Sequence, residues 1–157
     1  MRFSGEVDWV ATIDVQPIID WILPIDFEEW PQQTRLEDGA IRPAMVTDLS
    51  WHDFGEQVSD AVAETLQHYP GCRAANVMLT VVMPRHNIPP HIDQQPPYWV
   101  GRIHIPLTTN DESRFIVGES AHHMNVGNSY IVNTEVMHAV ENAGSTPRIH
   151  LMFDINA

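Results

Sequence analysis

The hydrophobic pattern of this chain changes its period at Pro70-Gly71, and this change limits what the chain can fold into. Before that point, apolar residues recur at helical spacing over residues 15–23, with Asp14 as a candidate N-cap, and over residues 53–69. Pro70-Gly71 ends the second of these helices. We predict that the second helix packs on a sheet and covers it, and we assign that helix no chemistry.

After Pro70-Gly71, apolar side chains run continuously or alternate with a period of two, which is typical of strands. In residues 100–107, Ile103 and Ile105 share one face, while Arg102 and His104 share the other. Many short strands separated by glycine-containing turns favour a sandwich or a barrel. The predicted strands are residues 77–83, 100–107, 114–117, 129–133 and 148–155.

The predicted fold class is therefore mainly β: a double-stranded β-helix, or cupin-like jelly roll, with flanking N-terminal α-helices. We expect a single domain over residues 1–157, because neither half of the chain could bury a core of its own. In this domain, residues 1–70 would supply helical support and the first strands. Residues 71–157 would form the jelly-roll core that carries the site.

Composition agrees with a globular protein and restricts its partners. The 157 residues are 43% hydrophobic and 18% charged, and the single cysteine, Cys72, excludes an internal disulfide. A formal net charge of −13 repels phosphate backbones, so we expect no nucleic-acid partner. We find no signal-peptide pattern and no run approaching the ~20 apolar residues that span a bilayer. We therefore expect a cytoplasmic protein with no membrane partner.

His91, Asp93 and His138 are the candidate metal ligands. Residues two apart in a strand point to the same side, so His91 and Asp93 could face one point. The pair alone carries little weight, because nine histidines and 21 acidic residues produce such spacing by chance. His138, which lies beyond three predicted strands, completes a set of two imidazoles and one carboxylate. Such a set binds one face of an octahedral metal and leaves the other positions open, as in non-haem Fe(II) oxygenases.

Arg148 is the candidate anion-binding residue. It follows His138 by ten residues, and a hairpin of that length would place it on the adjacent strand, deeper in the barrel. A guanidinium there can bind a carboxylate through two parallel hydrogen bonds. A bare metal site needs no such clamp. Arg148 therefore argues against the alternative of a cupin-type metal-binding or sensing protein without oxygenase activity. A purely structural protein would leave the whole set unexplained.

The segments that contain these residues resemble the aspartyl/asparaginyl β-hydroxylase family over residues 77–154. They are Pro90-His91-Ile92-Asp93, Gly101-Arg102-Ile103-His104-Ile105-Pro106-Leu107, Asn133, His138-Ala139-Val140-Glu141-Asn142 and Arg148-Ile149-His150-Leu151-Met152-Phe153-Asp154. The resemblance implies a double-stranded β-helix and a dioxygenase that uses Fe(II), O2 and the co-substrate 2-oxoglutarate. It makes His91 and His138 iron ligands, and it puts Asp93 at a carboxylate position that some members lack.

The resemblance also assigns residues to the co-substrate. Arg148 matches the arginine that holds the distal carboxylate of 2-oxoglutarate, and His104 matches a histidine near the other carboxylate. Arg102 matches a basic residue that faces the co-substrate or the substrate. The implied reaction is hydroxylation of an aspartyl, asparaginyl or other amino-acid-like substrate, either a small molecule or a peptide. The chain is much shorter than the animal members that act on growth-factor-like domains, so their substrate class does not carry over.

Overall fold

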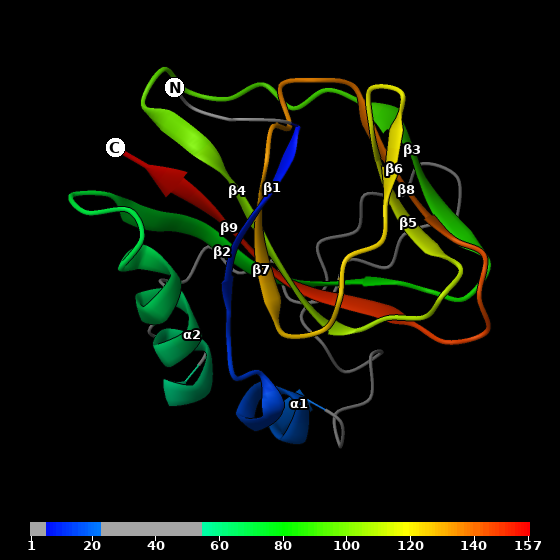
Figure 1. Ribbon diagram of the computed structural model, residues 1–157, viewed down its shortest axis with the longest axis horizontal. Helices are drawn as coiled ribbons and strands as arrows, with labels where there is room; N and C mark the ends of the chain where they lie inside the picture. The colour runs from blue at the N-terminus through cyan, green and yellow to red at the C-terminus, as the bar shows by residue number, and fades with distance from the viewer. Residues whose placement is uncertain (1–5, 23–54) are drawn as a thin grey trace.

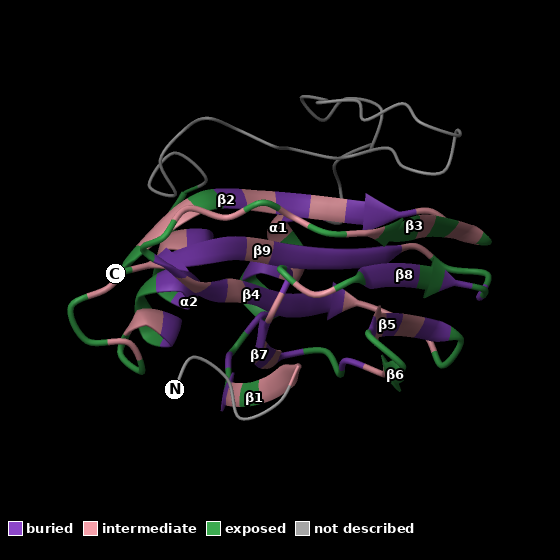
Figure 2. Ribbon diagram, turned by 90° about the horizontal axis from the view of Figure 1, so that it is seen from above, coloured by how far each residue is buried: buried purple, intermediate pink, exposed green. Residues whose placement is uncertain are grey.

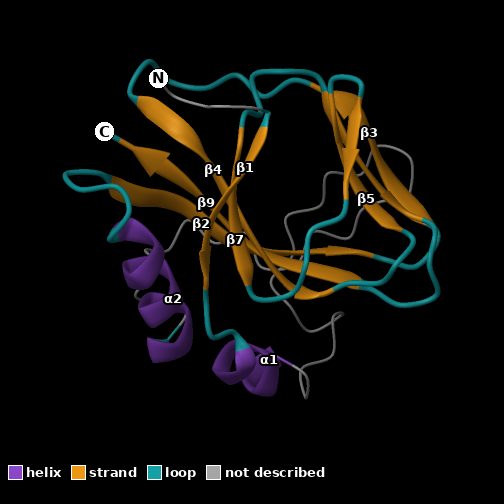
Figure 3. Cartoon of the chain, viewed as in Figure 1, coloured by secondary structure: helices purple, strands orange, loops and turns teal. Residues whose placement is uncertain are grey.

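The computed structural model describes residues 6–22 and 55–157, which form two helices and nine strands (Figures 1 and 3). In chain order, these are β1 (Val7–Thr12), α1 (Gln16–Ile22), α2 (Glu56–Leu66), β2 (Arg73–Val82), β3 (His86–His91), β4 (Trp99–Thr108), β5 (Ser113–Val117), β6 (Ser120–His122), β7 (Asn128–Val132), β8 (His138–Asn142) and β9 (Arg148–Asn156). Residues 23 and 53–54, at the ends of the predicted helices, lie outside the described residues.

Two antiparallel sheets face each other and enclose the interior of the molecule (Figure 1). The five-stranded sheet has the order β1-β7-β4-β9-β2, and the four-stranded sheet has the order β3-β8-β5-β6. Most neighbouring strands are distant in sequence, because the chain passes repeatedly from one sheet to the other. This arrangement confirms the double-stranded β-helix that the sequence predicts.

Both helices lie against the outer face of the five-stranded sheet, and for α2 this packing was predicted (Figures 1 and 2). The Asp14 side chain caps α1, since its Oδ1 accepts a hydrogen bond from the backbone nitrogen of Gln16 at 3.1 Å. Fully buried residues on the helices, such as Ile18 and Val58, join one apolar core with the outward residues of the sheet. Neither helix in the described part of the chain is long and apolar enough to cross a membrane.

Side-chain alternation along β4 and β9 separates an apolar outer face from a polar inner face. Outward residues, among them Ile103 and Leu151, belong to the core beneath the helices. The inward residues His104, Arg148 and Asp154 are polar, yet each is at most 3% exposed. Because buried polar groups require partners, this inner face is the natural place for a binding site.

β3 is a strand that the sequence pattern does not predict. It contains Pro89 and Pro90, and proline lacks the N–H group that a strand ladder uses. β3 nevertheless pairs with β8, because it is the edge strand of the four-stranded sheet and needs partners on one side only. The register between the two strands shifts between Ile88 and His91, where the prolines lie. This edge strand carries the first candidate ligand at its end.

The connection from β8 to β9 differs from the predicted hairpin. β8 pairs with β3 and β5, whereas β9 lies between β4 and β2 in the other sheet. The chain therefore crosses between the sheets from Asn142 to Arg148, and the prediction of adjacent strands is wrong. Arg148 still faces the interior, because both sheets contribute side chains to one central cavity.

The loop that makes this crossing leaves no space for a side chain at Gly144. A Cβ there would lie 2.7 Å from Nδ2 of Asn110 and closer still to the rest of that amide. The Asn110 amide cannot move aside freely, because its Nδ2 donates to Oδ1 of Asn142 at 3.0 Å and to the backbone oxygen of Thr146 at 3.1 Å. The loop, and with it the entry of Arg148 into β9, depends on this packing.

We expect Gly144→Ala to lower the free energy of unfolding by about 1–3 kcal/mol, the usual cost of forcing an extra carbon into a packed site. The measurement is urea unfolding, followed by circular dichroism. Ser145→Ala is the matched control in the same loop, because Ser145 is exposed and the change should stay within about 0.5 kcal/mol. Equal stability of the two variants would contradict the packing argument.

Candidate active site

The three candidate metal ligands lie together at one end of the four-stranded sheet. His91 is the last residue of β3, and His138 is the first residue of β8 directly opposite it in the strand register. Asp93 follows the end of β3, and its backbone nitrogen donates to the backbone oxygen of Thr134 at 3.0 Å. This hydrogen bond, made in the loop after β3, positions Asp93. Strand alternation does not, and that part of the sequence argument is wrong.

The ligand atoms of these residues converge on one point. All of them lie within 4.8 Å of one another. Nε2 of His91 lies 3.7 Å from Oδ1 of Asp93, and Nε2 of His138 lies 3.8 Å from Oδ2. The Nδ1 atoms of both rings face backbone oxygens instead. Nδ1 of His91 lies 2.8 Å from the backbone oxygen of Pro89, and Nδ1 of His138 lies 2.9 Å from the backbone oxygen of Val136. Such bonds fix the ring orientation and the tautomer of metal-binding histidines, and they leave Nε2 available to the metal.

The electrostatics of the site favour neutral imidazole at His138, which is the form that binds metals. Burial lowers the pKa of His138, and the nearby charges of Asp93 and Arg102 modify that effect in opposite directions. The Asp93 carboxylate is anchored from the other side, because Nη1 of Arg102 donates to its Oδ2 at 2.6 Å. The ligand set is thus preorganised by contacts outside it.

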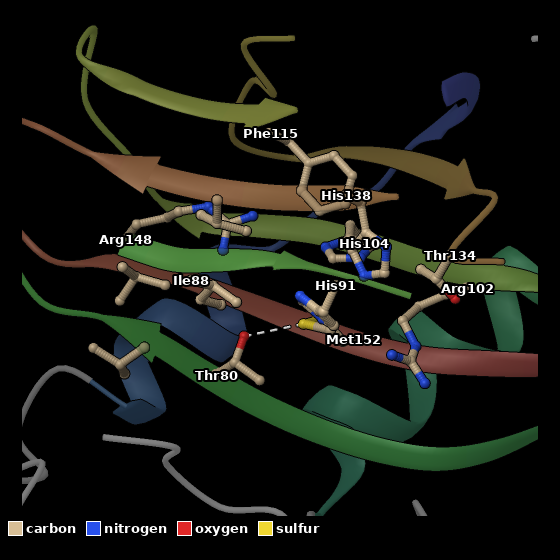
Figure 4. Close-up of a pocket in the computed structure, with 13 residues that line it drawn as sticks. Thr80, Ile88, His91, Arg102, His104, Phe115, Thr134, His138, Arg148 and Met152 are labelled. Atoms are coloured by element: carbon tan, nitrogen blue, oxygen red, sulfur yellow. Dashed lines mark hydrogen bonds between the residues drawn. The ribbon is translucent and has the colours of Figure 1, made fainter. Parts of the chain in front are cut away.

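His91, His138 and Arg102 border a cavity between the two sheets that is partly open to solvent, whereas Asp93 does not line it. Figure 4 shows Arg148 on one side of His91, His104 and His138, and Arg102 on the other side. The sequence-predicted site residues that line the cavity are His91, Arg102, His104, His138 and Arg148, and the other lining residues are Thr80, Val81, Val82, Ile88, Phe115, Thr134, Val140 and Met152.

Arg148 is a buried cation without an acidic partner among the described residues. Its side chain is 3% exposed, and no carboxylate of residues 6–22 or 55–157 forms an ion pair with it. Burial alone lowers its pKa to about 9, so the guanidinium stays charged at neutral pH. A buried charge without a partner is costly, and a bound anion would remove that cost.

Two buried histidines continue the polar surface from Arg148. Nη2 of Arg148 lies 3.0 Å from Nδ1 of His150, which must accept this bond because guanidinium nitrogens only donate. Nδ1 of His104 lies 3.3 Å from the same atom. Burial and the charge of Arg148 lower the pKa of both imidazoles far below the ordinary value, so both are neutral. Nε2 of His104 is buried without a partner in the described structure.

Several cavity residues were not found by sequence reasoning. Thr80 lines the cavity from β2, and its hydroxyl donates to Sδ of Met152 at 3.0 Å, a weak acceptor that a carboxylate could replace. Phe115 stacks on the His138 ring with centroids 6.0 Å apart. Single threonines and phenylalanines carry no signal in a sequence, and only the pairing of strands brings these two to the cavity.

The residues present fit both an iron ion and a dicarboxylate. Two imidazoles and one carboxylate form the donor set of a facial triad. The buried guanidinium of Arg148, which has no acidic partner among the described residues, supplies a cation in the same cavity. A comparison with protein-family models matches residues 51–157, more than half of the chain, to the aspartyl/asparaginyl β-hydroxylase model.

The chain belongs to the aspartyl/asparaginyl β-hydroxylase family. The resemblance seen in the sequence is thereby confirmed, and the chain is a hydroxylase that uses Fe(II) and 2-oxoglutarate. Comparison with curated protein sequences gives no significant match.

Solved structures share the fold of this β-hydroxylase at low sequence identity. A viral collagen prolyl hydroxylase from Paramecium bursaria Chlorella virus-1 superposes with a TM-score of 0.69 at 11% identity, with 98% of this chain and 97% of that chain covered. A prolyl-4-hydroxylase from Pseudomonas putida gives 0.68 at 13% identity, covering 98% and 93%. An oxidoreductase of the 2OG-Fe(II) oxygenase family from Burkholderia pseudomallei gives 0.64 at 11% identity, covering 96% and 84%.

Proposed function

We propose that this β-hydroxylase holds Fe(II) with His91, Asp93 and His138, and the distal carboxylate of 2-oxoglutarate with Arg148. We further propose that it hydroxylates an aspartyl, asparaginyl or similar amino-acid-like substrate. The observation that carries the proposal is the buried guanidinium of Arg148, which has no acidic partner among the described residues and faces the same cavity as the ligand histidines. The family match supports the amino-acid-like substrate.

The other polar residues of the cavity have proposed roles on the same basis. His104 would lie near the second carboxylate of 2-oxoglutarate, as the resemblance to the family implies, because it lines the same cavity as Arg148. Contact between Arg102 and the co-substrate stays a prediction, and the bonds of Arg102 to two carboxylates of the chain point to a different task for it.

The contribution of the protein to the reaction is orientation and exclusion of water. When bound, Fe(II) supplies the activation of O2 that is coupled to decarboxylation of 2-oxoglutarate to succinate and CO2. Neutral His138 offers its Nε2 without first losing a proton. Arg148 fixes one end of the co-substrate with charge-assisted hydrogen bonds, and apolar neighbours such as Val82 and Phe115 keep that end of the cavity dry.

Calorimetric titration of the Mn(II)-loaded protein with 2-oxoglutarate tests the proposed site. We expect saturable binding of 2-oxoglutarate and much weaker binding of glutarate. Glutarate keeps both carboxylates for Arg148 and His104, but it lacks the keto oxygen that joins one carboxylate in chelating a metal. A metal-loaded protein that binds no 2-oxoglutarate would instead be a cupin-type metal protein without oxygenase activity.

The substrate class is tested separately, with Fe(II), 2-oxoglutarate and O2 present. We expect aspartyl or asparaginyl peptides, or the free amino acids, to increase succinate formation and to gain one oxygen atom by mass spectrometry. Glutamyl and glutaminyl peptides are the controls, because they add one methylene to the same functional groups. Binding of 2-oxoglutarate without turnover of any aspartyl or asparaginyl compound would overturn only the substrate assignment.

A further inference from the structure

Asp154 is a buried carboxylate with an unusually complete set of hydrogen-bond donors. It is 1% exposed and lies on the inner face of β9, directly opposite Arg102 of β4. Its Oδ1 accepts from Nε1 of Trp99 at 3.0 Å and from Nε of Arg102 at 2.9 Å. Its Oδ2 accepts from Nδ2 of Asn76 at 2.8 Å and from Nη2 of Arg102 at 3.1 Å. Asp154 does not line the central cavity, so it has no direct contact with the proposed ligands.

The backbone of β2 is distorted at the point where it reaches Asp154. Asn76 has a φ of 50°, and the register between β2 and β9 shifts between Ala75 and Met78. Asparagine tolerates this left-handed conformation better than most residues, and the bulge lets its side chain point at Oδ2. A fold that needed only a filled interior here would not require a bulge, a tryptophan nitrogen and an arginine directed at one carboxylate.

Arg102 joins this buried carboxylate to the candidate metal ligand. One edge of its guanidinium, Nε and Nη2, binds Asp154, and this leaves Nη1 directed at Oδ2 of Asp93. Burial lowers the pKa of Arg102, but the hydrogen bonds and charges of Asp154 and Asp93 outweigh this effect and raise it. Arg102 is therefore a permanent cation held between two carboxylates.

We propose that Asp154 is a positioning residue for the metal site: it fixes Arg102, whose Nη1 holds Oδ2 of Asp93 and leaves Oδ1 as the metal-binding oxygen. Residues that orient a ligand from outside the coordination sphere typically change metal affinity by about 10–100-fold when they are removed. This inference rests on the proposed metal site and adds a residue to it that neither touches the metal nor lines the cavity.

Calorimetric titration with Mn(II) alone tests the proposal, because it needs neither 2-oxoglutarate nor turnover. Asp154→Asn keeps the shape of the side chain but removes its charge, so it should weaken Mn(II) binding by about 10–100-fold. Glu141→Gln is the matched control, since it also removes one negative charge but from an exposed position on β8. We expect this control to bind Mn(II) as the parent does.

A second test starts from the Arg102→Gln variant, and it separates a positioning role of Asp154 from a general effect of Asp154 on the fold. In Arg102→Gln, Asp93 has already lost its anchor, so adding Asp154→Asn should weaken Mn(II) binding no further. The double variant should also unfold at a higher temperature than Arg102→Gln alone, because it no longer buries an uncompensated carboxylate. It therefore provides a foldable variant even if Asp154→Asn alone does not fold.

The outcomes distinguish failure of the positioning role from failure of the proposed metal site. Parent-like Mn(II) affinity in Asp154→Asn would overturn the positioning role. So would a further loss of affinity when Asp154→Asn is added to Arg102→Gln. If instead the parent protein bound no Mn(II), the assignment of His91, Asp93 and His138 would fail, and the role of Asp154 would fail with it.

Discussion

Arg148→Ala is expected to abolish 2-oxoglutarate binding at ordinary concentrations while leaving metal binding intact. The guanidinium can make two charge-assisted hydrogen bonds to the distal carboxylate, at ~1.5–3 kcal/mol each. Because ~1.4 kcal/mol corresponds to tenfold in affinity, losing both bonds should weaken binding by about a hundredfold or more. The measurement is calorimetric titration of 2-oxoglutarate into Mn(II)-loaded variant and parent.

Two further variants define what Arg148 contributes. Arg148→Lys should retain partial binding, because the charge remains while the planar fork that binds a carboxylate twice is lost. Arg114→Ala is the control for loss of an arginine elsewhere, since Arg114 donates to the backbone oxygens of Asp111 and Ser113 and does not line the central cavity. If Arg148→Ala bound 2-oxoglutarate with the parent affinity, the proposed metal site would be unaffected, but Arg148 would not be the residue that binds the distal carboxylate.

His138→Ala and Asp93→Ala are expected to be purified without stoichiometric metal. Each variant removes one of the three proposed protein bonds to the ion, so the loss should exceed the ~10–100-fold typical of residues outside the coordination sphere. Metal content after purification and a Mn(II) titration are the measurements. His123→Ala is the matched control, because its Nδ1 lies 3.2 Å from the backbone oxygen of Ser113 and His123 is not part of the candidate ligand cluster. Parent-level metal in both ligand variants would mean that the site lies elsewhere.

The sequence pattern predicts where helices and strands form better than it predicts which strands pair with each other. The period of two in residues 100–107 and 148–155 corresponds to β4 and β9, and the apolar positions of both strands do face the helices. The pattern assigns no strand to the segments that form β1, β3, β6 and β8. It misses β3 because two prolines look like a turn when the position of the strand at a sheet edge is unknown. Periodicity reports which way a side chain points, but it does not report which strand lies alongside.

For the candidate site too, the sequence suggests the residues involved but not how they are brought together. The order of His91, Asp93, His138 and Arg148 along the chain is sufficient to suggest the chemistry, and the structure brings the first three within reach of one ion. The explanations for that proximity are tertiary. Asp93 is held by the backbone of Thr134, not by strand alternation, and Arg148 enters from the opposite sheet, not from an adjacent strand.

The sequence by itself determined the residue types that the chemistry needs, the helix and strand periods, and the resemblance to the β-hydroxylase family. These depend on local spacing and side-chain chemistry, which a linear chain records directly. Only the tertiary structure decided that Arg148 lacks an acidic partner among the described residues, and that Arg102 links Asp154 to Asp93. Both facts depend on distances between strands far apart in sequence. Burial and pairing of charges are therefore set by how the two sheets close around the cavity, which no single segment encodes.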